Sequence, residues 1–136
     1  MRIAFGTDES TALTGAIKQH LIEGGHNVVA AAADATAWPD VGRAVGEAVA
    51  GDRADIGVVC CWTGTGVSIA ANKVPGVRAA LCTDSETARG ARRWNDANVL
   101  AMSLRLVSPD VAAEMIDAFL STEPDPDEAP EIAKLA

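Results

Sequence analysis

The residues best suited to chemistry lie in one short segment, residues 60–66, which reads Cys-Cys-Trp-Thr-Gly-Thr-Gly. It ends an apolar run that predicts a buried strand and precedes a stretch, up to residue 73, with the pattern of a helix. A strand that passes through a glycine-rich turn into a helix directs backbone N–H groups and the positive helix end towards one point. That point suits an anion or a polar oxygen, and Cys61 would stand beside it as a proton-transfer group.

Cys61 has two interpretations. A cysteine is more often a small buried apolar residue than a base. Its place at a strand end, beside a helix start, instead favours a reactive thiol, and we prefer that interpretation. Cys60 should point to the opposite face of the sheet and Cys82 ends a later strand, so both are predicted to be core residues.

The elements that must position this segment alternate along the chain. Strand patterns occur at residues 2–6, 27–33, 55–61, 77–82 and 98–102, and helix patterns at 11–23, 40–50, 68–73, 84–94 and 109–120. Alternating strands and helices form βαβ units, hence a parallel sheet covered by helices on both faces. The predicted fold is therefore an α/β, three-layer α/β/α sandwich with a five-stranded parallel sheet.

In such a sheet the carboxyl ends of the strands share one edge, where ligands collect. That edge would gather Asp8 and Glu9, Asp34, residues 61–66, Asp84 and Ser103. Asp8 either caps the first helix or holds substrate hydroxyl groups and shuttles a proton. Trp62 and Trp94 either pack in a core or interface or form a stacking wall for a sugar.

Size and composition exclude several classes of protein. With 136 residues the chain makes one domain, predicted at residues 1–122, followed by an acidic, proline-containing tail at 123–136. A net charge of −8 argues against binding to nucleic acid or an anionic membrane. No apolar run is long enough to span a bilayer, and residues 1–5 lack the pattern of a signal peptide. The three cysteines fit neither a disulfide framework nor a zinc site, so a cytoplasmic protein without metal is expected.

Three stretches together resemble the B-type ribose-5-phosphate isomerases and the related galactose-6-phosphate isomerase subunits. They are Asp8 with residues 61–66, then residues 68–80 (Ser-Ile-Ala-Ala-Asn-Lys-Val-Pro-Gly-Val-Arg-Ala-Ala), and residues 95–100 (Asn-Asp-Ala-Asn-Val-Leu). The resemblance extends over residues 2–121. It implies a Rossmann-like fold, a homodimer or dimer of dimers with sites shared between subunits, and aldose–ketose isomerisation through an enediolate without metal or cofactor.

The same resemblance assigns roles to particular residues. Cys61 would be the base that takes the C2 proton, and backbone N–H groups of residues 63–66 would support the enediolate oxygens, which places Thr63 in the catalytic turn. The remaining expected substrate contacts are Asp8, Glu9, Trp62, Gly64, Thr65, Gly66, Ser68, Trp94, Asn95 and Arg105.

The chain also departs from the family pattern. Glu9 replaces a histidine, as it does in one type of galactose-6-phosphate isomerase subunit, and Trp62 replaces a glycine. Trp94 replaces the histidine that opens the sugar ring, and an indole cannot act as that acid. The family's arginine- and histidine-rich tail is acidic here, which leaves Arg105, with Arg92 or Arg93, for a phosphate.

These departures favour a substrate other than ribose 5-phosphate, one that needs no ring opening. The first hypothesis is therefore an aldose–ketose isomerase for a sugar or sugar phosphate that uses Cys61. The alternative is a non-catalytic sugar-binding module or the partner subunit of a heteromer. A nucleotide-binding domain is disfavoured because the turn lacks the full G-x-G-x-x-G pattern.

Overall fold

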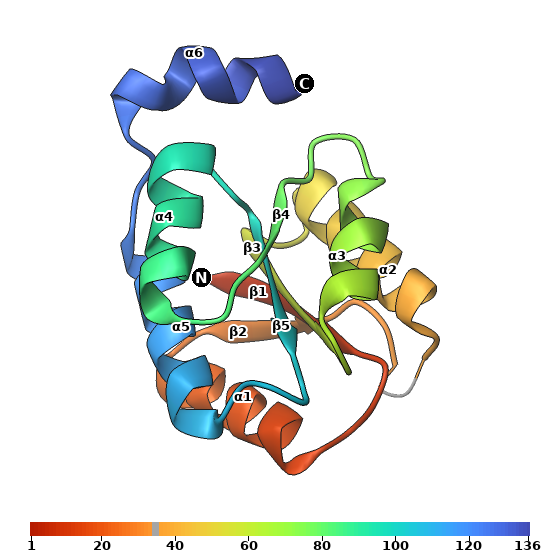
Figure 1. The fold of residues 1–136 in the computed structure, drawn as a ribbon. Helices are drawn as coiled ribbons and strands as arrows, with labels where there is room; N and C mark the ends of the chain where they lie inside the picture. The colour runs from red at the N-terminus through yellow and green to blue at the C-terminus, as the bar shows by residue number, and fades with distance from the viewer. Residues whose placement is uncertain (34–35) are drawn as a thin grey trace.

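The computed structural model describes residues 1–33 and 36–136 as a sheet of five parallel strands between two layers of helices (Figure 1). The strand order is β2-β1-β3-β5-β4. The strands are β1 (Arg2–Thr7), β2 (Asn27–Ala30), β3 (Ile56–Cys61), β4 (Ala79–Leu81) and β5 (Val99–Ser103). The main helices are α1 (Ala12–Glu23), α2 (Trp38–Ala50), α3 (Thr65–Asn72), α4 (Ser85–Asn95) and α5 (Pro109–Ser121). The predicted three-layer, Rossmann-like fold is confirmed.

Alternate residues of the central strands supply two separate cores. In β3, Val58 and Cys60 face the layer formed by α1, α4 and α5, whereas Val59 and Cys61 face α2 and α3. The period of two along a strand produces this division, and full coverage of both faces explains why the strands are apolar throughout. Cys60, Cys61 and Cys82 are all buried, and the predicted core positions of Cys60 and Cys82 are confirmed.

Glycines allow α2 to lie very close to the sheet and to α3. A Cβ atom on Gly57 would lie 2.6 Å from Cγ1 of Val45 in α2, and one on Gly42 would lie 2.6 Å from Cβ of Ala70 in α3. At such distances an added side chain would force the neighbouring atoms to shift. The close packing of α2 and α3 in turn places the first turns of both helices side by side.

The helix starts distinguish between the two interpretations of Asp8. Thr11 caps α1, since its side chain accepts a hydrogen bond from the N–H of Thr14 in a capping box. The interpretation of Asp8 as the cap is therefore wrong. Asp84 and Ser108 cap α4 and α5, accepting hydrogen bonds from the N–H groups of Thr87 and Val111.

Several element boundaries differ from the prediction, and the largest differences are in β2, β4 and α3. The edge strand β2 ends at Ala30 rather than residue 33, because its ladder with β1 stops there and the alanines that follow have weak strand preference. The edge strand β4 is also shorter, at Ala79–Leu81. In contrast, α3 begins at Thr65 rather than Ser68, so the glycine turn is part of the helix start. Asp34 lies outside the described residues.

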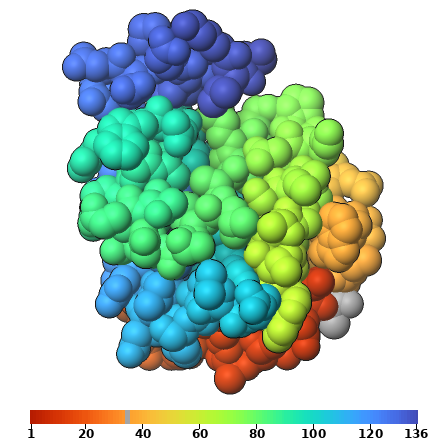
Figure 2. Space-filling model, in the orientation of Figure 1, coloured from red at the N-terminus to blue at the C-terminus, as the bar shows by residue number. Residues whose placement is uncertain are grey.

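The C-terminal segment forms short helical turns η1 (Pro126–Glu128), α6 (Ala129–Ile132) and η2 (Ala133–Leu135). It follows α5 and forms a ridge over the end of α4 in Figure 2, where the N–H of Asp125 donates to the carbonyl oxygen of Arg93 at 2.8 Å. None of its residues is buried. No helix in the described parts of the chain has the length and apolar character needed to cross a membrane.

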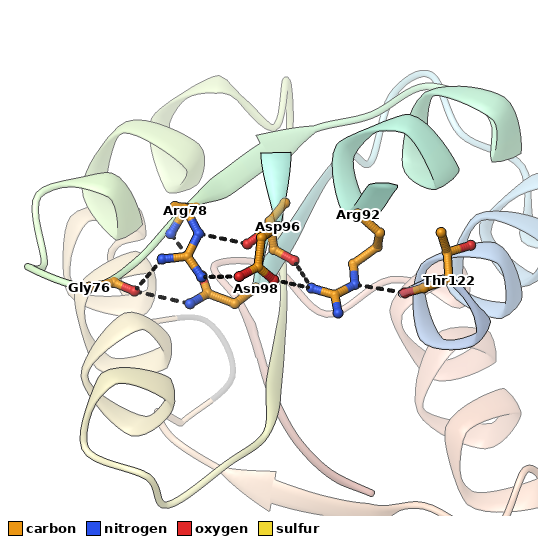
Figure 3. A network of polar contacts seen from close by, with 7 residues as sticks. Gly76, Arg78, Arg92, Asp96, Asn98 and Thr122 are labelled. Atoms are coloured by element: carbon orange, nitrogen blue, oxygen red, sulfur yellow. Dashed lines mark hydrogen bonds and ion pairs between the residues drawn. The ribbon is translucent and has the colours of Figure 1, made fainter. Parts of the chain in front are cut away.

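Arg92 links the end of α4 to the chain that leaves α5 (Figure 3). Its guanidinium donates to Oδ1 of Asp96 at 3.1 Å and to the carbonyl oxygens of Ala97 at 2.6 Å and Thr122 at 3.2 Å. Arg78 reaches the other carboxylate oxygen of Asp96, at 3.1 Å. The Arg92 side chain is only 12 % exposed. It packs over the Phe119 ring and forms an ion pair with Asp96.

Replacement of Arg92 by methionine is expected to lower the free energy of unfolding by about 2–3 kcal/mol, because hydrogen bonds from a charged group are lost and acceptors remain unpaired. Methionine keeps the apolar stem over Phe119. Equilibrium denaturation measures the change, with Arg93→Met as the matched control. Arg93 is exposed, and its replacement should cost less than about 0.5 kcal/mol. Equal losses in the two variants would contradict a structural role for the Arg92 contacts.

Candidate active site

A pocket lies where the chain leaves the sheet in opposite directions. β1 continues into α1 on one face and its neighbour β3 continues into α3 on the other, so a crevice opens between their carboxyl ends. This pocket has a volume of about 330 Å³. Its lining residues are Asp8, Trp38, Cys61, Trp62, Thr63, Thr65 and Gly66.

Cys61 is one of the residues that line the pocket. It is the last residue of β3 and is 5 % exposed, in contact with the core on the α2 and α3 side. Burial raises the pKa of the neighbouring Cys60 thiol far above its usual range, and the nearby Cys61 and Asp8 add to the rise. Burial also raises the pKa of Cys82 to about 11. Of the three thiols, only that of Cys61 combines a strand-end position with a place in this pocket.

The turn after Cys61 presents the start of α3 to the pocket. Gly64 adopts a left-handed conformation with φ of +76°, which reverses the chain directly before the helix. No side chain caps α3, and the hydroxyl groups of Thr63 and Thr65 bond to each other at 2.7 Å. The N–H of Thr65 donates a long hydrogen bond to Oγ1 of Thr63 at 3.5 Å. The other N–H groups of the first turn and the positive end of the helix can stabilise a developing negative charge.

Residues at and after the end of β5 donate hydrogen bonds to the carbonyl oxygens of Cys61 and Trp62. The N–H of Leu104 donates to the carbonyl oxygen of Cys61 at 2.9 Å. The carbonyl oxygen of Trp62 accepts from the N–H of Arg105 at 3.1 Å and from Oγ of Ser103 at 2.9 Å. Three hydrogen bonds from the end of β5 and the residues after it thus hold the Cys61–Trp62 backbone in place.

Asp8 places a carboxylate in the same pocket, and one of its oxygens accepts no hydrogen bond from the described residues. Its Oδ1 atom is buried and finds no hydrogen-bond partner within residues 1–33 and 36–136. A buried carboxylate oxygen without a donor is costly. The arrangement is explained if a hydroxyl group of a ligand donates to it, as the functional interpretation of Asp8 requires.

Some of the substrate contacts expected from the sequence do not line this pocket. Glu9 is exposed beyond β1, and Ser68 lies one turn into α3. Arg105 contributes the backbone hydrogen bond to Trp62, and its side chain is exposed.

Trp94 and Asn95 are also separate from this pocket. They end α4, at the edge of the sheet where β5 begins, and line a different cavity of about 630 Å³ beside β4. One chain therefore does not bring them to Cys61.

Trp38 is a lining residue that the sequence did not identify. It is the first residue of α2 and is 45 % exposed, with its ring against Gly66. The sequence feature that could have identified it is a large aromatic residue directly before Pro39, at the end of the loop that follows the second strand. Its ring and that of Trp62, which is 59 % exposed, give the pocket two indole walls.

The charge of the pocket is simple. Among the described lining residues Asp8 is the charged one, and the other polar groups are hydroxyl and backbone groups. Within residues 1–33 and 36–136 there is no group of three or more His, Cys, Asp or Glu residues that could hold a metal ion. The arrangement provides a thiol, a carboxylate and a helix start, which together suit proton transfer on a small polar molecule.

Comparisons with known proteins agree with this arrangement. A model of the Ribose/Galactose Isomerase family matches residues 3–135. Ribose-5-phosphate isomerase B of Escherichia coli (strain K12) is 39 % identical over 126 residues, which cover 90 % of this chain and 85 % of that protein. D-erythrulose-4-phosphate isomerase of Pectobacterium atrosepticum is 36 % identical over 128 residues, covering 90 % and 84 %. The structure of Clostridium thermocellum ribose-5-phosphate isomerase B superposes with a TM-score of 0.93 at 39 % identity, covering 99 % of this chain and 95 % of that one.

Proposed function

The chain belongs to the Ribose/Galactose Isomerase family, and from this membership we propose that it interconverts an open-chain aldose and ketose with Cys61 as the base. The observation that carries the proposal is that Cys61, Asp8 and the start of α3 line the same pocket. Each of these groups has a task in moving a carbonyl group between C1 and C2.

The proposed reaction begins with an aldose whose C2 hydrogen faces Sγ of Cys61. The thiolate takes this proton, and the electron pair of the C2–H bond forms the C1–C2 double bond of an enediolate. Negative charge moves to O1, where the N–H groups at the start of α3 stabilise it. The Cys61 thiol then returns its proton to C1, the O2 hydroxyl proton passes to the former carbonyl oxygen by way of Asp8, and the ketose results.

The substrate class follows from the tryptophan at position 94. In the family pattern a histidine at this position opens the sugar ring, and an indole N–H does not titrate in the working range of an enzyme. A four-carbon sugar with a phosphate on O4 has no free O4 hydroxyl with which to close a five-membered ring. We therefore place the substrate among short open-chain sugars and their phosphates, in keeping with the named activity of the Pectobacterium relative.

The proposed assembly is a homodimer with sites shared between subunits. Trp94 and Asn95 lie at the sheet edge opposite to Cys61, so they join the site only if a second copy supplies them. The exposed Trp94 and Leu81, at the open edge beside β4, provide apolar surface for such a contact. Two such dimers would form the dimer of dimers that the family resemblance implies.

Proton exchange with solvent tests the catalytic proposal. In deuterium oxide, the protein should introduce deuterium at C2 of an aldose or C1 of its ketose, and NMR follows both positions. The panel contains D-erythrose 4-phosphate, D-ribose 5-phosphate and the unphosphorylated sugars. We expect the four-carbon sugars to react faster than D-ribose 5-phosphate.

A second candidate is a non-catalytic sugar-binding module or the partner subunit of a heteromer. Trp62 and Trp94, which replace a small and a titratable residue of the family pattern, favour it. Such a protein would bind sugars in calorimetry and leave their carbon-bound hydrogens unexchanged. Binding without exchange across the panel would contradict the isomerase proposal.

A further inference from the structure

Trp38 separates the candidate active site from a second hollow. The second hollow lies between the outer surfaces of α2 and α3 and has a volume of about 390 Å³. It is lined by residues such as Arg43, Ile69, Lys73 and Val74. Of the residues that the structure describes, Trp38 alone lines both spaces, so it lies between them.

The indole is held in this position by the backbone of α3. A Cβ atom on Gly66 would lie 2.8 Å from Cε3 and 2.9 Å from Cδ2 of Trp38, so the ring lies directly on the glycine. Gly66 is in the first turn of α3, next to the N–H groups that face the pocket. The ring therefore has a defined place at the end of the site, and the residue as a whole remains 45 % exposed.

The two spaces that Trp38 lines have different chemistry. On the site side the charged lining residue is Asp8, whereas the hollow beyond Trp38 is lined by the cations Arg43 and Lys73 together with Glu47. Arg43 pairs only loosely with Asp40, at 3.4 Å, and is 58 % exposed, so it can turn towards an anion. A phosphate on a longer sugar chain is the kind of anion that such cations bind.

We infer that Trp38 is a specificity-determining residue that limits the length of the sugar chain accepted beside Cys61. The inference rests on the proposed isomerase function and deepens it. An indole wall contacts the carbon–hydrogen groups of a short substrate, which an aromatic surface favours. It excludes further carbons, and a single added group at a close-fitting wall typically changes kcat/KM by about 10- to 200-fold.

The test compares two substrates in one variant. We expect Trp38→Ala to raise the ratio of kcat/KM for an aldohexose 6-phosphate to kcat/KM for an aldotetrose 4-phosphate by at least about tenfold. A loss of stability or of general activity would lower both values and leave their ratio unchanged. Ile22→Ala, which removes a similarly exposed apolar side chain from α1, is the matched control and should keep the wild-type ratio.

The outcomes separate this inference from the proposed function. A ratio that moves less than tenfold in Trp38→Ala, while the wild type still turns over sugars, overturns the length limit alone. A wild type that converts none of the sugars overturns both. Should Trp38→Ala lose its folded circular dichroism spectrum, Trp38→Leu repeats the comparison. Its smaller side chain should shift the ratio in the same direction, and an unchanged ratio there counts against the inference.

Discussion

Replacement of Cys61 by alanine is expected to lower kcat for the isomerisation about a thousandfold, because the general base that takes the C2 proton is lost. KM should change little, since Asp8, the indole walls and the start of α3 remain in the pocket. Cys61→Ser should be almost as slow, because a serine hydroxyl does not ionise near neutral pH and so supplies no anionic base in place of a thiolate. Steady-state kinetics and solvent exchange at C2 measure the loss.

Cys60→Ala is the matched control for this change. Cys60 precedes Cys61 directly, but it is fully buried on the other face of the sheet, with the core of α1, α4 and α5. Its removal should cost about 1 kcal/mol of stability and leave kcat within a few-fold of the wild type. If Cys61→Ala kept more than a tenth of the wild-type kcat, Cys61 would not be the base.

The fold was predictable because the sequence patterns of its strands and helices are local and recur along the chain. Apolar strands separated by helix patterns predict a parallel sheet, and the carboxyl ends of its strands must then share an edge. From that rule alone we predicted that Asp8, Cys61 and the glycine turn lie together. All three contribute to the lining of the pocket. Thr11, rather than Asp8, proved to be the helix cap because its hydroxyl lies at the correct spacing before Thr14.

The rest of the site depended on packing between helices, which sequence patterns do not report. Trp38 reaches the pocket because α2 and α3 approach closely at their glycines, a contact between segments far apart in the chain. Trp94 and Asn95 illustrate the opposite case. The motif that includes them predicts substrate contacts, yet α4 ends at the far edge of the sheet, so within one chain they line a separate cavity. The proposed homodimer would bring them to the site of a second copy.

The replacement of Gly64 by alanine is expected to have the largest effect on the turn itself. Gly64 has φ of +76°, where an L-residue with a side chain is strained by about 1 kcal/mol. A Cβ atom there would also lie 2.6 Å from Cδ1 of Leu81, and 2.9 Å and 3.0 Å from the backbone C and O atoms of Met102. Backbone atoms of a buried central strand cannot move aside easily, so overpacking adds a further loss of about 1–3 kcal/mol.

We therefore expect Gly64→Ala to lose about 3 kcal/mol of unfolding free energy and to lower kcat about a hundredfold, because the turn must shift away from β5 and carries Cys61 and the start of α3 with it. Gly25→Ala separates the two causes. Gly25 has φ of +82°, and a Cβ atom added to it would have nothing within 4 Å, so this variant should lose only the backbone contribution of about 1 kcal/mol and keep its kcat. Denaturant unfolding and steady-state kinetics on both variants measure the difference. Equal losses in the two would mean that backbone strain alone acts at Gly64, and that the close approach of the turn to β5 does not hold the catalytic thiol in place.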